Sequence, residues 1–275
     1  MLRLARRAQR AAPSRETPRM APHDPDERKI AVFIDMDNVV IGVRDSKQPG
    51  FDINLVLSRL VEKGDIVVKK AYADWNHHKN YKRPMHDAAI ELIDIPESRR
   101  TGKNSADIKM VVEAMELSYT KPHIDTFVLV SGDSDFSPLV SKLRENDKHI
   151  IGVGVKNSSA RILIDNCDEF LFYDELETKA ARRPPAQNGW TNLPQKKKEA
   201  FEQLLTAVKA LQRENKGLYG SLVKDTMKRL QPQFNEEYHG YTSFSRLLED
   251  AQENKLIELQ TDPRSGTYVI SKVQD

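Results

Sequence analysis

Two aspartates follow a short apolar run near the middle of the chain. Asp133 and Asp135 lie within the segment 131–136 (SGDSDF), directly after the apolar residues 127–130. Ligands of open α/β sheets bind at the carboxyl ends of strands, so these side chains are expected where a substrate would arrive. Two carboxylates this close repel each other unless a cation or a proton lies between them, and hard oxygen ligands suit Mg²⁺ or Mn²⁺. Capping of the next helix by Asp133 explains the same residues equally well.

A second acidic strand end makes a metal site the better interpretation. Asp35 ends another apolar run, and Asp107 opens an expected helix at 106–118. Parallel strands end at one edge of their sheet, which gathers Asp35 and Asp133 into one crevice. For Asp107, which lies three residues after Asn104, a capping-box-like arrangement is the alternative.

These acidic residues belong to a pattern that resembles a known family. The pattern extends through about residues 30–175 and is similar to the NYN domain, specifically to its LabA-like branch among the PIN-like nucleases. The resemblance implies a PIN-like fold with a compact parallel sheet. The positions that carry it are Asp35, Asn38, Lys103, Asp107 and the segment 131–136. The implied catalytic residues are Asp35, Asn38, Asp107, Asp133 and Asp135.

The activity that the resemblance implies is metal-dependent hydrolysis of RNA. A Mg²⁺ or Mn²⁺ ion held by Asp35, Asp107, Asp133 and Asp135 would activate a water molecule and stabilise charge on the leaving oxygen. Asn38 would orient a ligand or a water. Cations are needed as well, because an acidic body repels RNA. The RNA contacts expected near the site are Arg99, Arg100, Lys103 and Ser131, with a solvated loop as the alternative for the first three.

Two other functions stay open at this point. Asp35 and Asp37 also satisfy the D-x-D-x-[TV] signature of haloacid-dehalogenase-like phosphatases, in which Asp35 would be the nucleophile and Asp37 the acid or base. No Ser or Thr strand-end motif follows in the order that those enzymes need. The other alternative is a non-catalytic RNA-binding or adaptor protein on the same fold.

His77 and His78 are adjacent and have no cysteine partner, which predicts a polar loop instead of a metal site.

The elements that must position these residues alternate between strands and helices. Nearly continuous apolar strands indicate burial on both faces, and the alternation predicts a doubly wound parallel α/β sheet. A further short strand is expected at 91–95. The other expected strands are 30–34, 66–68, 127–130, 150–153 and 170–172. The expected helices are 53–62, 85–93, 106–118, 136–146 and 160–166.

The C-terminal part follows a different pattern. Expected helices at 196–215, 221–230 and 243–254 precede two short strands, and three helices with a terminal hairpin describe a small winged-helix domain. Its aromatic and glycine positions, such as Tyr219 and Gly240, resemble the OST-HTH or LOTUS domain, whose members bind RNA or helicase partners. We therefore expect a disordered basic tail at 1–28, the NYN domain at 29–176, a basic linker at 177–195 and the winged-helix domain at 196–272.

Charge is unevenly distributed along the 275 residues. Residues 30–178 carry 19 Lys and Arg against 25 Asp and Glu, whereas residues 179–198 carry six Lys and Arg and no acidic residue. An acidic body with basic flanks predicts that the flanks bind a polyanion. The cations of this segment expected to bind RNA are Arg182, Arg183, Lys196, Lys197 and Lys198.

Composition limits the class of protein and its location. Mean hydropathy is −0.62, and no apolar run approaches the roughly 20 residues that cross a bilayer, so no membrane partner is expected. The single cysteine, Cys167, leaves no internal disulfide framework and fits a reducing compartment. We therefore expect a cytoplasmic protein, although the Arg-rich start resembles an organellar transit peptide or a basic nucleic-acid-binding arm.

Overall fold

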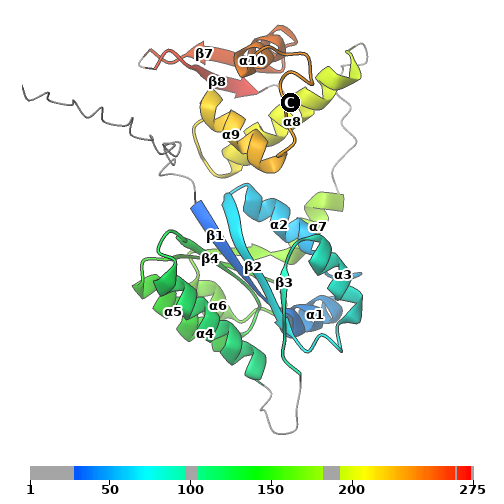
Figure 1. Ribbon diagram of the computed structural model, residues 1–275, viewed down its shortest axis with the longest axis vertical. Coiled ribbons are helices and arrows are strands. Elements are labelled where there is room, and N and C mark those ends of the chain that lie inside the picture. Colours follow the sequence, from blue (N-terminus) through cyan, green and yellow to red (C-terminus); the bar gives the residue numbers. More distant parts are fainter. Residues whose placement is uncertain (1–27, 97–103, 182–192, 264, 274–275) are drawn as a thin grey trace, which may run out of the picture.

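The computed structural model describes residues 28–96, 104–181, 193–263 and 265–273. A parallel sheet of six strands, in the order β3-β2-β1-β4-β5-β6, forms the centre of the larger domain (Figure 1). This confirms the parallel α/β sheet predicted from the sequence. The strands are β1 (Arg28–Asp35), β2 (Gly64–Ala73), β3 (Glu91–Asp94), β4 (Thr126–Val130), β5 (His149–Gly154) and β6 (Glu169–Phe172).

Helices cover both faces of this sheet (Figure 1). Along β1, Ile30, Val32 and Ile34 are buried in one layer, and Ala31 and Phe33 are buried in the other. Burial on both faces explains why the strand sequences are nearly continuously apolar. Within the described ranges, no helix has the length and apolar character needed to span a membrane. The first layer contains α1 (Met36–Asp45), α2 (Ile53–Val61), α3 (Lys79–Asp87) and α7 (Tyr173–Ala181). The second layer contains α4 (Ser105–Thr120), α5 (Ser137–Glu145) and α6 (Arg161–Asn166).

The strand order reverses between β1 and β4. From β1 the chain winds through β2 to β3 on one side, and from β4 it winds through β5 to β6 on the other. The helices that follow β1 and β4 lie on opposite faces, and sheets of this kind bind ligands in the crevice between two such connections. Asp35 ends β1 and Ser131 follows β4, so the two acidic segments meet at this point.

Some elements differ from the expectation. The prediction of a helix at 85–93 is wrong. Helix α3 begins earlier, with Pro84 in its interior, and ends at Asp87, and the residues that follow form strand β3. Ala89, with φ of 52°, reverses the chain between them, so the apolar residues that follow join the sheet. Helix α1 was not expected, since it follows β1 without any turn residue between them. Helix α7 continues past residue 176, where the sequence placed the end of the domain.

The C-terminal domain consists of three helices and a two-stranded antiparallel hairpin, as the sequence predicts. Phe201, Leu204, Val208 and Leu211 form the buried face of its first helix. Ser243 caps the third helix, because its side chain accepts a hydrogen bond from a first-turn amide at 3.3 Å. The elements are α8 (Gln195–Arg213), α9 (Gly220–Leu230), α10 (Phe244–Glu253), β7 (Ile257–Thr261) and β8 (Tyr268–Val273).

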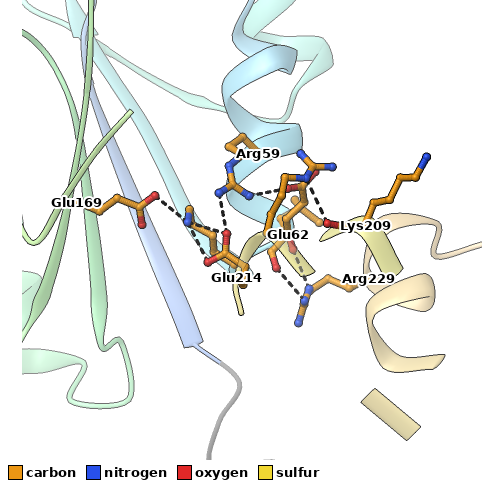
Figure 2. A network of polar contacts seen from close by, with 9 residues as sticks. Arg59, Glu62, Glu169, Lys209, Glu214 and Arg229 are labelled. Atoms are coloured by element: carbon orange, nitrogen blue, oxygen red, sulfur yellow. Dashed lines mark hydrogen bonds and ion pairs between the residues drawn. The ribbon is translucent and has the colours of Figure 1, made fainter. Parts of the chain in front are cut away.

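The C-terminal domain lies against the amino-terminal edge of the sheet, opposite to the edge that carries Asp35 (Figure 1). Lys63, which precedes β2, has a side chain only 2% exposed and lies 2.9 Å from Glu214 at the end of α8. It also lies 2.8 Å from Glu169 at the start of β6. Arg59 reaches Glu214 at 2.7 Å, so one carboxylate of the C-terminal domain faces two cations of the sheet domain (Figure 2).

Two arginines of the C-terminal domain complete this junction. Arg229, near the end of α9, donates to the carbonyl oxygens of Val61 at 2.7 Å and of Glu62 at 3.2 Å (Figure 2). Arg213 lies 3.0 Å from the Glu62 carboxylate, which is only 8% exposed. Every charge named here therefore has a partner across or beside the junction, as buried charges require.

Candidate active site

Asp35 is held rigidly at the end of β1. It is 5% exposed, and one carboxylate oxygen caps α1 by accepting from the Asn38 amide at 3.2 Å. The other oxygen accepts from the Ser131 hydroxyl at 2.9 Å. Each oxygen of an ionised carboxylate has more than one acceptor site, so both retain capacity for a further ligand. The carboxylate is thus oriented by protein donors before anything binds.

The loop after β4 is tied to α1 by further hydrogen bonds. The Gly132 amide donates to the Asn38 side-chain oxygen at 2.8 Å, and the Asp133 amide donates to the Ser131 hydroxyl at 3.2 Å. Asn38 therefore fixes the loop that carries Asp133. The role that the resemblance implies for it, orienting a ligand or a water, stays a prediction. Ser131 is fully buried, so it orients Asp35 and Asp133 and has no surface for the expected RNA contact.

Asp133 begins the short 3₁₀ turn (Ser134–Phe136) that leads into α5. One of its carboxylate oxygens accepts from the Asp135 amide at 2.9 Å, so the capping role that the sequence left open is present. Asp133 is half-buried and Asp135 is exposed. Capping engages one oxygen of Asp133, and the other stays available for a cation or a water.

Asp107 joins the cluster from the first turn of α4, where it is half-buried. The pKa of its carboxyl is raised by burial, and then by the charges of Asp133, Asp135 and Asp37. Among the described residues, the side chain of Asn104 makes no cap hydrogen bond to this helix, so that part of the capping alternative is not realised.

The carboxylates of the cluster influence one another across four different segments. Burial is the main cause that raises the pKa of Asp35 to about 7, and the charges of Asp107 and Asp37 raise it further. Hydrogen bonds from the Asn38 amide and the Ser131 hydroxyl offset only part of this. Such a cluster favours any group that brings positive charge, a cation above all. We call Asp35, Asp37, Asp107, Asp133 and Asp135 the acidic cluster.

Two residues at the site were not among the predicted nuclease residues, although Asp37 was a candidate acid or base in the phosphatase alternative. Asp37 enters the cluster from the first turn of α1, and the His78 Nε2 atom contacts its carboxylate. His78 lies in the loop between β2 and α3, as the sequence predicts, but its side chain is only 11% exposed because it turns toward Asp37. A signal was available, because His78 follows β2 at the same edge of the sheet. Other acidic residues at this edge have local roles: Asp94 accepts from the Trp75 amide at 3.1 Å.

The donors of the acidic cluster suit a hard divalent cation. All are carboxylate oxygens, the ligands that Mg²⁺ and Mn²⁺ select. Within the described residues, no group of three or more His, Cys, Asp or Glu side chains is arranged to hold one ion. Mg²⁺ usually keeps several waters and takes only one or two protein carboxylates. The donor set therefore fits such an ion with water completing its shell.

The described cations predicted to bind RNA, Lys196, Lys197 and Lys198, are not gathered at this cluster. The Lys196 ammonium lies 4.3 Å from the centre of the Tyr238 ring, and Lys197 lies 2.7 Å from Asp250. Together with Lys198 they begin α8, in the domain docked at the opposite edge of the sheet. The predicted contacts that lie outside the described residues are Arg99, Arg100, Lys103, Arg182 and Arg183.

The domain that carries this site matches a known family. Residues 29–175, more than half of the chain, match the NYN domain along the whole of the parallel sheet. This chain belongs to the NYN domain family. NYN domains are typically ribonucleases, which supports a nuclease enzyme at the level of the family. The family match ends before the C-terminal domain begins.

Two further proteins are similar to this NYN protein. The uncharacterized protein MJ0482 of Methanocaldococcus jannaschii is 30% identical over 131 residues, which cover 47% of this chain and 49% of that protein. This chain thus spans about half the length of that curated relative. The crystal structure of VPA0982, a protein of unknown function from Vibrio parahaemolyticus RIMD 2210633, is similar with a TM-score of 0.50 and 25% identity. The similarity covers 56% of this chain and 98% of that structure.

Proposed function

We propose that this NYN domain is a metal-dependent ribonuclease that hydrolyses RNA phosphodiesters at the acidic cluster. The observation that carries the proposal is the meeting of Asp35, Asp107 and Asp133 from three elements, close enough for their charges to raise the pKa values of Asp35 and Asp107. A fold gains no stability from such a meeting, because like charges and burial both disfavour it. A binding function explains why the carboxylates are nevertheless together.

The residues of the site divide into ligands and positioning groups. One or two of the carboxylates of Asp35, Asp107 and Asp133 would hold a Mg²⁺ or Mn²⁺ ion directly, and the others would accept hydrogen bonds from its water ligands, with Asp135 exposed beside them. When bound, such an ion lowers the pKa of water and stabilises negative charge on phosphate oxygens. Ser131 and Asn38 keep Asp35 and the Asp133 loop in fixed positions through hydrogen bonds of 2.9 and 2.8 Å. The site is therefore preorganised before RNA arrives.

The C-terminal domain has a separate proposed role. We infer that its three helices and hairpin form a winged-helix domain of the OST-HTH or LOTUS type, which recruits RNA or an RNA helicase. The segment 179–198, with six Lys and Arg and no acidic residue, would add sequence-independent affinity for the RNA backbone. Lys197 is already paired with Asp250, which reduces its own contribution to that affinity.

The variant Asp133→Asn tests the ribonuclease proposal most directly. Asn retains the side-chain oxygen that caps the turn, so the fold is kept while the negative charge is removed. Labelled single-stranded and structured RNAs are incubated with wild type or variant in Mg²⁺, Mn²⁺ or EDTA, with RNA binding measured in parallel. We expect the wild type to cleave RNA only when metal is present, and the cleavage rate of the variant to be lower by about 100-fold or more.

The matched control is Asp94→Asn, which changes another strand-end aspartate that lies outside the acidic cluster. It should cleave like the wild type, and all three proteins should melt at similar temperatures. Full activity of Asp133→Asn would overturn the site assignment. RNA binding without cleavage by any of the proteins would replace the nuclease with an RNA-binding adaptor.

A further inference from the structure

Helix α3 carries a row of basic side chains on one face. Lys79, Lys82, Arg83 and His86 are spaced i, i+3, i+4 and i+7, which brings them onto one side of the helix. Met85, which is fully buried, anchors the other side against the sheet. The basic face is thereby turned away from the core. We call Lys79, Lys82, Arg83 and His86 the α3 stripe.

The charges of the α3 stripe are accessible to a ligand. Lys79 and Arg83 are exposed and Lys82 is half-buried. In the part of the chain that the structure describes, neither Lys79 nor Lys82 forms an ion pair with a carboxylate. The contact of Arg83 with Asp87 is long, at 3.8 Å, and both side chains are more than 70% exposed. Exposed pairs of this kind contribute little, so a polyanion does not have to displace a strong partner.

The α3 stripe begins at the acidic cluster. His78 directly precedes α3 and contacts Asp37, which lies two residues after Asp35. From Lys79 to His86 the helix rises by about 10 Å, at about 1.5 Å per residue. A stacked nucleic-acid strand places its phosphates about 3.4 Å apart along the axis, so the stripe matches about three of them.

The acidic cluster needs cations nearby if it is to act on RNA, and the α3 stripe supplies them. The five carboxylates of the cluster repel the phosphates that they would have to approach, so the affinity for RNA has to come from phosphates beside the cleaved bond. We propose that the α3 stripe binds the RNA backbone on one side of the scissile phosphate and feeds it into the acidic cluster. This inference rests on the proposed ribonuclease function and assigns its substrate-positioning surface to the NYN domain itself.

The test is the triple variant Lys79→Ala, Lys82→Ala and Arg83→Ala. Alanine is a strong helix former, so α3 is expected to stay folded, and a thermal melt checks this. Cleavage of a labelled single-stranded RNA should show KM raised about tenfold or more, with kcat nearly unchanged, so that the fall in kcat/KM comes mainly from KM. In EDTA, the dependence of log Kd on log salt should become shallower by about 2, because each lost phosphate contact removes about 0.7.

A matched variant separates the α3 stripe from a general loss of positive charge. It replaces three cations elsewhere in the NYN domain, all more than 60% exposed, and should keep the KM and salt dependence of the wild type. The three substitutions are Arg44→Ala, Lys142→Ala and Arg161→Ala. An unchanged KM and salt dependence in the α3 variant, with a wild type that cleaves RNA, would overturn the stripe alone. A wild type that neither binds nor cleaves RNA would overturn the ribonuclease proposal as well.

Discussion

The position of Asp35 is unfavourable for the fold and informative about function. Its carboxyl is buried, and the charges of Asp107 and Asp37 add to the effect of burial on its pKa. Two hydrogen bonds orient it but do not neutralise it. Sites that must bind a cation or move a proton commonly sacrifice stability in this way. The residue is thus better explained by what it binds than by what it packs against.

This conflict predicts that an inactive variant is more stable than the wild type. Asp35→Asn keeps the shape of the side chain and an oxygen to cap α1 but removes the buried charge. In EDTA at pH 8, where the carboxylate is ionised, we expect Tm to rise by about 2 °C or more, since 1 kcal/mol corresponds to about 2–4 °C in domains of this size. Differential scanning calorimetry measures this directly.

Asp94→Asn serves as the comparison for that measurement, because Asp94 is exposed at another strand end and should leave Tm nearly unchanged. A Tm for Asp35→Asn well below that of the wild type would mean that the carboxylate stabilises the metal-free fold, contrary to the argument from burial and repulsion.

Among the elements, the loop after β4 depends on the absence of a side chain at Gly132. A Cβ there would lie 2.9 Å from the Ser159 Cα atom and 3.0 Å from the Ser158 carbonyl oxygen, both of them backbone atoms. The Gly132 carbonyl oxygen also accepts from the Ala160 amide at 2.8 Å. The loop is therefore wedged between α1 and the segment that follows β5.

Gly132→Ala should consequently displace the loop and the Asp133 that it carries. We expect the free energy of unfolding to fall by about 1–3 kcal/mol and cleavage to fall at least tenfold, because catalytic groups tolerate only small displacements. Chemical denaturation and the RNA cleavage assay measure the two effects. Gly50→Ala is the control, since the nearest atom to its added Cβ is the Tyr81 hydroxyl at 4.0 Å. Equal activity of both variants would show that the loop accommodates a methyl group.

Sequence reasoning succeeds where topology leaves little choice. Parallel strands send their carboxyl ends to one edge, so the meeting of Asp35 and Asp133 follows from recognising β1 and β4. The bond between Asn38 and Gly132 depends on the exact turn by which α1 starts, which no periodicity reveals. The role of His78 could not be predicted for the same reason. Its contact with Asp37 depends on the path of the loop after β2, about which the local sequence pattern carries little information.

At the scale of the whole molecule, the domain junction rests on charges that are far apart in the sequence. Lys63 and Glu214 lie about 150 residues apart, and nothing in their surroundings distinguishes them from solvated surface charges. Hydrophobic periodicity therefore predicted both domains but could not predict how they dock. Ion pairs of this kind become visible only once the fold has brought them together.

The junction is expected to weaken in acid. Burial alone raises the pKa of Glu214, but the Lys63 ammonium and then the Arg59 guanidinium outweigh it, so the pKa lies below its ordinary value of 4.5. The stabilisation is therefore complete above pH 4.5 and is lost as the pH falls further. Small-angle X-ray scattering should show the radius of gyration increasing as the domains separate below that pH.

Glu214→Gln should loosen the junction already at neutral pH. The positive charges of Arg59 and Lys63 then lose the carboxylate that faces them, although Lys63 keeps its ion pair with Glu169. We expect the free energy of unfolding to fall by about 2–3 kcal/mol. Glu258→Gln, at an exposed ion pair in the hairpin, should change neither scattering nor stability. If Glu214→Gln keeps the compact scattering profile at neutral pH and in acid, apolar contacts hold the domains together.

The docking of the C-terminal domain at the amino-terminal edge of the sheet fixes its distance from the acidic cluster. The eight residues of β1 separate the C-terminal domain from the acidic cluster by about 26 Å, at about 3.3 Å per residue. Under the proposed recruitment of RNA by the C-terminal domain, an RNA that engages both ends has to bridge this length, roughly eight base pairs of duplex. Shorter fragments would touch only one end and dissociate sooner, so under that proposal the spacing between the domains would favour long substrates and the release of short products.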